Sequence, residues 1–222
     1  MTVTLLARFG ESAAVAKPSG LLVHNSDWAG PPEPTLTDAA RTLLGECDPL
    51  HRLDRGTSGV VWFCLDRSRY AAHHAALQAQ TAVKRYLALV RGHLRERVEL
   101  DHPVPDGEGG RLGARSLVTP LAISPVERVS LVEVRLFTGR RHQARLHLKH
   151  LSHPVIGDAN YGKGAINRDL AARYGLSRLA LHCVEASYEP PSGGRATALA
   201  PVDPSLAEPL DRLVPGWRAA VG

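Results

Sequence analysis

The pattern of apolar and polar residues along the chain predicts many short strands and a few helices. Strand-like runs, most bounded by Gly, Pro or Ser, are expected at residues 2–8, 14–16, 20–24, 60–65, 83–90, 116–123, 129–137 and 179–188. Helical spacing of apolar residues predicts helices at 36–44, 67–80, 141–151 and 205–213. Asp66 is expected to cap the second of these helices, because its carboxylate can accept first-turn amide bonds. Since no regular βαβ repeat occurs, the pattern favours an α+β domain with a mixed, largely antiparallel sheet.

The length of 222 residues suits one large domain or two small ones. The stretches richest in Pro and Gly, at 30–34 and 105–110, are expected to be surface loops, so no linker favours a division. We therefore expect a single domain over residues 1–222.

The cysteine content and the apolar runs indicate where the protein acts. Cys47, Cys64 and Cys183 are an odd number without close pairing, which favours a reducing compartment. No apolar run approaches the roughly 20 residues that a membrane span needs, and the N-terminus lacks the pattern of a signal peptide. The sequence predicts a cytoplasmic protein that does not bind membranes.

Positive charge is concentrated in one part of the chain. The formal net charge is +5, and no acidic residue lies between Glu133 and Asp158. Such a block of one sign is typical of a nucleic-acid surface, although a solvated helix face is an equally open interpretation. The basic residues of this block are Arg135, Arg140, Arg141, Arg145 and Lys149.

The segment 51–59 places one carboxylate, Asp54, between two arginines, Arg52 and Arg55. The apolar run at 60–65 follows directly and predicts a strand buried on both faces. Asp54 is therefore expected on a loop anchored by the core, where reactive groups are often placed. It is either a structural ion-pair partner or a reactive group that its surroundings keep ionised.

Three segments together resemble a known enzyme family. His-Arg-Leu-Asp-Arg-Gly-Thr-Ser-Gly at 51–59 resembles the signature loop of the RluA-type pseudouridine synthases. Residues 83–92, and residues 138–147 with 153–158, are similar to further family motifs in the same order. The resemblance implies the pseudouridine synthase fold, which is a twisted sheet with flanking helices and an active cleft across one face.

The resemblance also implies an activity and its catalytic residues. Isomerisation of uridine breaks the bond from ribose C1′ to uracil N1 and joins C1′ to C5, so the chemistry requires no metal and no cofactor. Asp54 corresponds to the catalytic carboxylate, which acts as a nucleophile or as a base. Arg145 is expected to keep Asp54 ionised, with Arg140 or Arg141 as the alternative partner. Tyr86 is expected to stack on the uracil, the alternative being an ordinary core aromatic.

Other residues of these motifs are expected to bind the substrate. Arg52 is predicted to fill the place of the extruded base, or otherwise to pair with a phosphate or carboxylate. Leu181 resembles a late family segment and is expected to pack against the uracil. The further substrate-binding residues that we expect are Lys84, Arg140, Arg141 and His142.

A histidine cluster invites a metal hypothesis that the sequence does not favour. His147, His150 and His153 are spaced by three residues, but Pro154 is expected to end the helix near His153. No Cys or Glu completes a known zinc pattern, so we expect no metal site. The imidazoles are expected to bond the backbone or to contact RNA.

The expected partner is RNA, with transfer RNA favoured over ribosomal RNA. Residues 149–158 and 162–168 resemble the family subgroup that modifies uridine 65 of transfer RNA. Asn160-Tyr161 and Ala144 depart from the usual pattern of that subgroup. A non-catalytic RNA-binding protein on the same fold is the alternative from another class. Because the first core motif begins at Lys17, we expect no N-terminal accessory RNA-binding domain, and we expect no obligate protein partner.

Overall fold

The computed structural model describes residues 2–25 and 33–221, and it divides into two compact units. The first unit comprises residues 1–84 and 183–201, and the second comprises residues 85–182 and 202–222. Residues 30–32 of the first expected surface loop lie outside the described ranges. That the chain forms a single domain stays a prediction.

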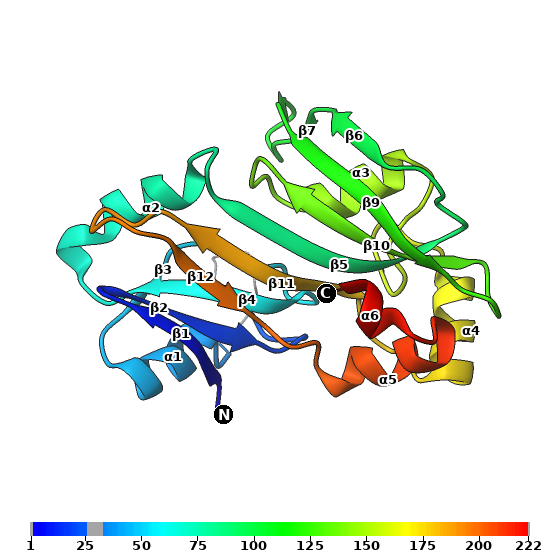
Figure 1. The fold of residues 1–222 in the computed structure, drawn as a ribbon, viewed down its shortest axis with the longest axis horizontal. Helices are drawn as coiled ribbons and strands as arrows, with labels where there is room; N and C mark the ends of the chain where they lie inside the picture. The colour runs from blue at the N-terminus through cyan, green and yellow to red at the C-terminus, as the bar shows by residue number, and fades with distance from the viewer. Residues whose placement is uncertain (1, 26–32, 222) are drawn as a thin grey trace. The chain divides into compact units, whose positions relative to one another are not determined.

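The first unit is built on antiparallel strands that surround the strand following Asp54. β1 (Thr4–Phe9) pairs with β2 (Ser12–Lys17), which pairs with β4 (Ser58–Cys64). Every residue of β4 is buried, as its unbroken apolar run predicted. Figure 1 shows these strands in blue and cyan. The other elements of this unit are α1 (Leu36–Leu44), β3 (Asp48–Pro49), a 3-10 turn η1 (Arg67–Arg69), α2 (Tyr70–Gln78), most of β11 (Leu181–Tyr188) and β12 (Ala196–Leu199).

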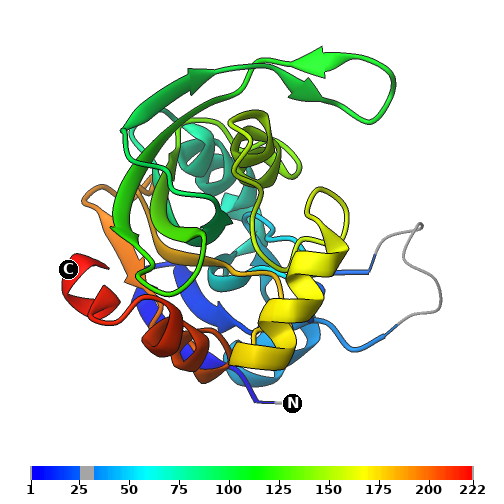
Figure 2. The ribbon, with the colours of Figure 1, turned by 90° about the vertical axis from the view of Figure 1, so that its right-hand side faces the viewer.

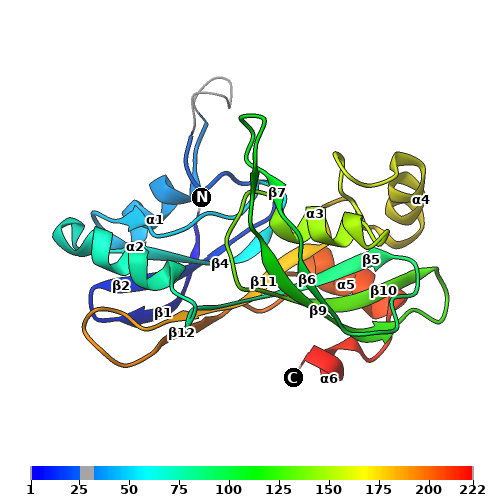
Figure 3. The same cartoon turned by 90° about the horizontal axis from the view of Figure 1, so that it is seen from above.

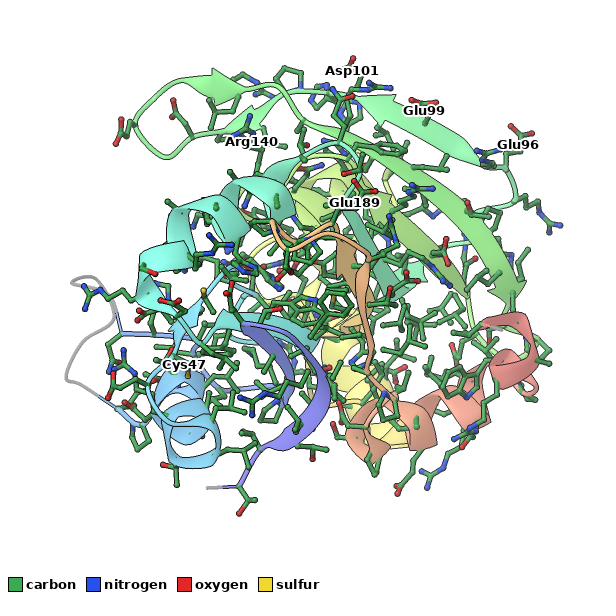
Figure 4. The ribbon with its side chains drawn as sticks, turned by 60° about the vertical axis from the view of Figure 1, so that its left-hand side comes forward. Cys47, Glu96, Glu99, Asp101, Arg140 and Glu189 are labelled. Atoms are coloured by element: carbon green, nitrogen blue, oxygen red, sulfur yellow. The ribbon has the colours of Figure 1, made fainter. Side chains whose placement is uncertain are left out.

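The core of the first unit buries aromatic rings and thiols. Trp62 on β4 donates its indole N–H to the Ala186 carbonyl at 3.0 Å and meets the Tyr188 ring edge-on at 5.4 Å. This pairing satisfies the one polar group of a fully buried indole. The side chains of Cys47, Cys64 and Cys183 are buried, and burial raises the pKa of the Cys47 thiol, labelled in Figure 4, to about 11.

In the second unit, helix α3 (Gln143–His150) packs against a sheet of antiparallel strands. Figure 3 shows α3 lying across these strands. Their order is β5 (Val83–Arg91), β10 (Val129–Leu136), β9 (Arg115–Ile123) and β6 (Val98–Asp101). The remaining elements are the hairpin of β7 (Val104–Pro105) and β8 (Arg111–Leu112), and the helices α4 (Gly164–Tyr174), α5 (Pro204–Leu213) and α6 (Trp217–Val221). Figure 2 shows α4, in yellow, beside α5.

The observed elements confirm the α+β class and correct several local predictions. The strand expected at 20–24 is wrong, because Gly20 adopts a φ of +87° and its N–H bonds the Arg55 carbonyl. The carbonyls of Leu22 and Val23 instead accept the first amides of α1. The helix expected at 141–151 begins only at Gln143, because His142 has a φ of +55°.

Other boundaries and caps show where sequence patterns succeed and fail. Asp66 caps as predicted, since its Oδ1 accepts the Ser68 N–H at 2.9 Å, but it caps the 3-10 turn that precedes α2. The apolar pattern did not predict β3, β6, β7, β8, β12, α4 and α6. Among the described helices, none is long and apolar enough to span a membrane.

Candidate functional site

Asp54 lies half-buried in a tight turn immediately before β4. Its carbonyl accepts the Thr57 N–H at 3.0 Å, which closes the turn. Gly59, at the start of β4, has a φ of +120°, and a Cβ there would lie 2.1 Å from the Cys183 carbonyl oxygen. Glycine is therefore required for the backbones of β4 and β11 to approach each other just after this turn.

The backbone of this turn is held by a buried lysine. Lys17 is 1% exposed and ends β2. Its Nζ donates to three carbonyl oxygens, those of Pro18 at 2.9 Å, Arg55 at 3.0 Å and Thr57 at 2.6 Å. A buried ammonium costs much free energy unless hydrogen bonds compensate it, and here backbone dipoles do so. Lys17 thus fixes the turn that carries Asp54. The sequence placed Lys17 in a motif but assigned it no role.

The two arginines that flank Asp54 behave differently. Arg55 binds both carboxylate oxygens of Glu33, at 2.8 and 3.0 Å, and donates its Nε to the Gly20 carbonyl. Arg52 is exposed and forms no ion pair with the described residues. The alternative in which Asp54 pairs with Arg55 therefore loses support, whereas Arg52 has the exposure that a role in base extrusion needs.

His51 anchors the other end of the turn as a neutral ring. Its Nε2 accepts the backbone N–H of Trp62 at 3.1 Å. Burial, together with the nearby charge of Lys84, lowers the pKa of His51 to about 3. Lys84 is itself 8% exposed, and burial lowers its pKa below the usual range. His51 is therefore an uncharged acceptor at neutral pH.

Arg145, on α3 in the second unit, has a carboxylate partner that the sequence did not suggest. Its Nε and Nη2 bind the two oxygens of Asp158 at 2.8 and 2.9 Å, and both side chains are buried. Asp158 also accepts the backbone N–H groups of Asn160 and Tyr161. Burial raises the pKa of Asp158, but the hydrogen bonds from Arg145, Tyr161 and Asn160 outweigh it and hold that pKa below its usual range. The expected pairing of Arg145 with Asp54 stays a prediction.

Tyr161 packs against the guanidinium of Arg145. The Arg145 guanidinium carbon lies 5.0 Å from the centre of the Tyr161 ring, and Lys149 Nζ lies 5.5 Å from it. The Tyr161 hydroxyl meets Nδ1 of His142, the residue before α3, at 2.9 Å. Such cation–π contacts fix both the position and the plane of a guanidinium. The position at which this chain departs from the subgroup pattern thus contacts the predicted catalytic arginine.

The loop that carries Arg140 and Arg141 is organised by a single amide side chain. Gln143 Oε1 accepts from Thr138 Oγ1 at 2.8 Å and from the Arg140 N–H at 3.1 Å. Arg140 Nε donates to the Gly113 carbonyl near the β7–β8 hairpin, and Figure 4 labels this side chain. Arg141 is exposed. The basic block of the sequence is therefore spread over a strand, a loop and a helix, and it is not one solvated helix face.

Tyr86 and Leu181 occupy buried strand positions. Tyr86 on β5 is 7% exposed, whereas Arg85 beside it pairs with Glu133 at 2.8 Å. Neighbouring side chains that point to opposite faces, one buried and one paired at the surface, are what the predicted strand requires. Leu181, at the start of β11, is 2% exposed. The burial of Tyr86 suits both a stacking role and a core role, so stacking on uracil stays a prediction.

The histidines near α3 make structural hydrogen bonds. His147 Nε2 bonds the His102 carbonyl at 2.8 Å and Nδ1 meets Ser116 Oγ at 2.5 Å, while burial lowers its pKa. The ring of His150 stacks on that of His102 at 3.8 Å, and His153 Nδ1 bonds the Arg91 carbonyl at 2.7 Å. Within residues 2–25 and 33–221, no group of three or more His, Cys, Asp or Glu is arranged to hold a metal ion.

The chain matches a family model described as RNA pseudouridylate synthase over residues 12–150. The chain belongs to this family. It is 36% identical to tRNA pseudouridine synthase C of Haemophilus ducreyi over 82% of this chain and 83% of that protein. It is 32% identical to tRNA pseudouridine synthase C of Haemophilus influenzae, over 96% and 98% of the two chains.

Solved structures support the fold. Human RNA Pseudouridylate Synthase Domain Containing 1 superposes with a TM-score of 0.74 at 24% identity, over 92% of this chain and 86% of that one. Human RNA Pseudouridylate Synthase Domain Containing 4 gives the same TM-score at 21% identity, over 94% and 92%. The family match and the two relatives confirm the resemblance found in the sequence. The protein is a pseudouridine synthase, an isomerase that acts on RNA.

Proposed function

We propose that this pseudouridine synthase isomerises a uridine of transfer RNA, and that Asp54 is its catalytic carboxylate. Relatives named tRNA pseudouridine synthase C, which match most of the chain, support the choice of RNA. The observation that carries the role of Asp54 is its position on a half-buried turn whose carbonyls are held by Lys17. A fixed backbone places a carboxylate at one point, which is what a reacting group needs.

The reaction rearranges bonds within one nucleotide and is balanced without a co-reactant. The glycosidic bond from C1′ to N1 breaks, the uracil turns, and C5 bonds C1′ while losing its proton to solvent as N1 gains one. Asp54 acts either by adding to the nucleotide or by drawing a proton from the ribose. Both routes require the carboxylate to be ionised when the uridine arrives.

The surrounding residues receive supporting roles in this proposal. Arg145 keeps Asp54 in the ionised form, and Tyr86 stacks on the uracil, an interaction worth about 1–3 kcal/mol per base. Arg52 occupies the space left in the RNA by the extruded nucleotide. The remaining proposed substrate contacts are Lys84, Arg140, Arg141, His142 and Leu181.

The decisive experiment replaces the carboxylate by an amide of the same shape. Asp54→Asn is expected to lower the rate of tritium release from 5-labelled uridine in transfer RNA by about 10⁴-fold or more, because no ionised oxygen remains. Asp48→Asn, at a partly exposed ion pair with Arg41, is the matched control and should keep the wild-type rate. Turnover by Asp54→Asn within tenfold of wild type would contradict the role of Asp54. A wild-type enzyme that acts on ribosomal RNA and not on transfer RNA would contradict the substrate.

A further inference from the structure

A cleft in the second unit is lined by basic side chains that belong to neither the Asp54 turn nor the Arg145 network. Its volume is about 990 Å³, and its walls are the end of β5, the turn into β10, the segment after α3 and the first turns of α4. Figure 3 shows α4 near the right-hand ends of β5 and β10. The basic lining residues are Arg91, His93, Arg128, His153 and Lys163.

The positive charges of this cleft are not balanced by its own carboxylates. Glu127 and Asp169 also line it, but Arg173 binds both, with Asp169 at 3.0 Å. The Tyr174 hydroxyl donates to Glu127 as well, at 2.8 Å. By contrast, Arg91, Arg128 and Lys163 form no ion pair with any residue that the structure describes. Cations that face one cleft without carboxylate partners favour an anionic ligand.

The wall of the cleft is held rigid by backbone contacts. His153 Nδ1 bonds the Arg91 carbonyl, and the Gly92 N–H bonds the Arg128 carbonyl at 2.7 Å. A Cβ on Gly92 would lie 2.9 Å from the His153 ring, so the ring packs directly on the chain. Ser152 has a φ of +64°, a conformation that a non-glycine residue keeps only where its surroundings enforce it. The basic side chains therefore project from a preorganised wall.

We propose that this cleft binds the sugar–phosphate backbone of the substrate RNA at nucleotides other than the target uridine. None of the described residues that line it is a Phe, Tyr or Trp on which bases could stack, so the contact is to phosphates and is independent of sequence. The volume of the cleft lies at the upper end of the roughly 300–1,000 Å³ that is usual for ligand pockets. It is larger than the volume that one phosphate group would fill. The inference rests on the proposed function, because it assigns this site to the same RNA.

The test removes two exposed cations of the cleft and compares the effect with that of a matched change elsewhere. Arg128→Gln/Lys163→Gln is compared with Arg168→Gln/Arg212→Gln, which removes the same charge at exposed positions outside the lining. The dissociation constant for full-length transfer RNA is measured as a function of salt concentration, together with KM and kcat. The cleft variant should bind more weakly than the control, with a log–log salt slope smaller by about 0.7–0.9 for each phosphate that it no longer binds. Its KM should rise while kcat stays at the wild-type value.

Several outcomes would overturn the inference. Equal affinity and equal salt slope for the two double variants would remove the cleft from the RNA interface. A polyglutamate peptide that binds the wild-type protein but not the cleft variant, while both bind RNA equally, would assign the cleft to an acidic protein.

In a second measurement, bound RNA should protect Lys163 from acetylation in the wild-type protein and in Arg168→Gln/Arg212→Gln alike, and unprotected Lys163 would contradict the proposal. A wild-type enzyme without activity on transfer RNA would contradict the proposed function. An active enzyme whose affinity for RNA does not depend on the cleft residues would contradict only this inference.

Discussion

The Asp54 turn and the Arg145 helix hold their key side chains by different physical means. In the first unit, one buried ammonium, Lys17, binds three backbone carbonyls and thereby fixes the path of the chain. In the second unit, Arg145 is fixed through its own side chain, by the carboxylate of Asp158 and the ring of Tyr161.

This contrast determines which substitutions each region tolerates. Lys17 holds this turn through backbone carbonyls, among them that of Arg55, which leaves the Arg55 side chain available to bind Glu33. A guanidinium held through its own atoms depends on each partner separately. Changes at Lys17 should therefore disturb position, whereas changes at Asp158 should disturb charge balance and stability.

Among the residues that hold these two regions in place, the largest effect on rate is expected from Lys17→Met, which removes the donor for three carbonyls. Hydrogen bonds to charged groups contribute about 1.5–3 kcal/mol each, and a displacement of about 1 Å at a reacting group can cost about 100-fold in rate. We expect kcat to fall by about 100-fold in the tritium-release assay. Ser19→Ala, which removes only the 2.7 Å bond to the Gly56 carbonyl, serves as a graded control and should lose much less. A Lys17→Met enzyme with wild-type kcat would show that the turn does not need its ammonium.

The next largest effect is expected from Asp158→Asn, which removes the charge of the carboxylate that binds Nε and Nη2 of the buried Arg145 guanidinium. Breaking a buried pair by removing one partner typically costs about 3–5 kcal/mol of unfolding free energy. Urea denaturation should show this decrease, whereas Asp48→Asn, at a partly exposed pair, should lose no more than about 1 kcal/mol. Equal decreases in the two variants would mean that the Arg145–Asp158 pair is no more important than a surface contact.

Much of the fold could be predicted because it depends on local patterns. The helix at 36–44 has the predicted ends, and β4 is buried along its whole length, as an unbroken apolar run requires. The prediction missed α4, in which Leu170 is the one buried residue, so that the helix has no stripe of buried apolar side chains. The strand expected at 20–24 failed because its amides and carbonyls bond a turn and a helix start, and neither leaves a periodic signal.

The candidate site was only partly predictable for a similar reason. A motif can point to Asp54 and Arg145, but the partners of Lys17 are carbonyls, which every residue carries and no sequence pattern marks. The bond between Arg145 and Asp158 joins residues 13 positions apart across the end of α3, so helical spacing could not suggest it. The available sequence signal for Lys17 was a lysine directly after the short apolar run at 14–16.

A smaller effect concerns the pH dependence of stability and arises from His51, which lies in the segment before the Asp54 turn. The pKa of His51 is lowered from 6.5 to about 3 in the folded protein, so between these values the unfolded chain binds a proton that the folded chain does not. Stability should therefore fall as the pH falls below about 6.5, with a contribution from His51 of up to about 1.4 kcal/mol per pH unit. His51→Gln should reduce this slope by that amount in urea titrations at pH 4 to 6. An unchanged slope would show that His51 is protonated in the folded state.

The smallest effect is expected from Tyr161, whose ring touches Arg145 without neutralising it. A cation–π contact contributes about 0.5–2 kcal/mol, depending on how far it is shielded from water. Tyr161→Leu should therefore lower the free energy of unfolding by about 1 kcal/mol and lower kcat, because the guanidinium loses the surface that fixes its plane. Tyr161→Phe keeps the ring and removes only the hydroxyl that meets His142, so it should retain most of kcat. If Tyr161→Phe and Tyr161→Leu lowered kcat equally, the hydroxyl and not the ring would position Arg145. The difference from the Asp54 turn, which Lys17 holds by its backbone carbonyls, would then depend on the Asp158 carboxylate and not on the Tyr161 ring.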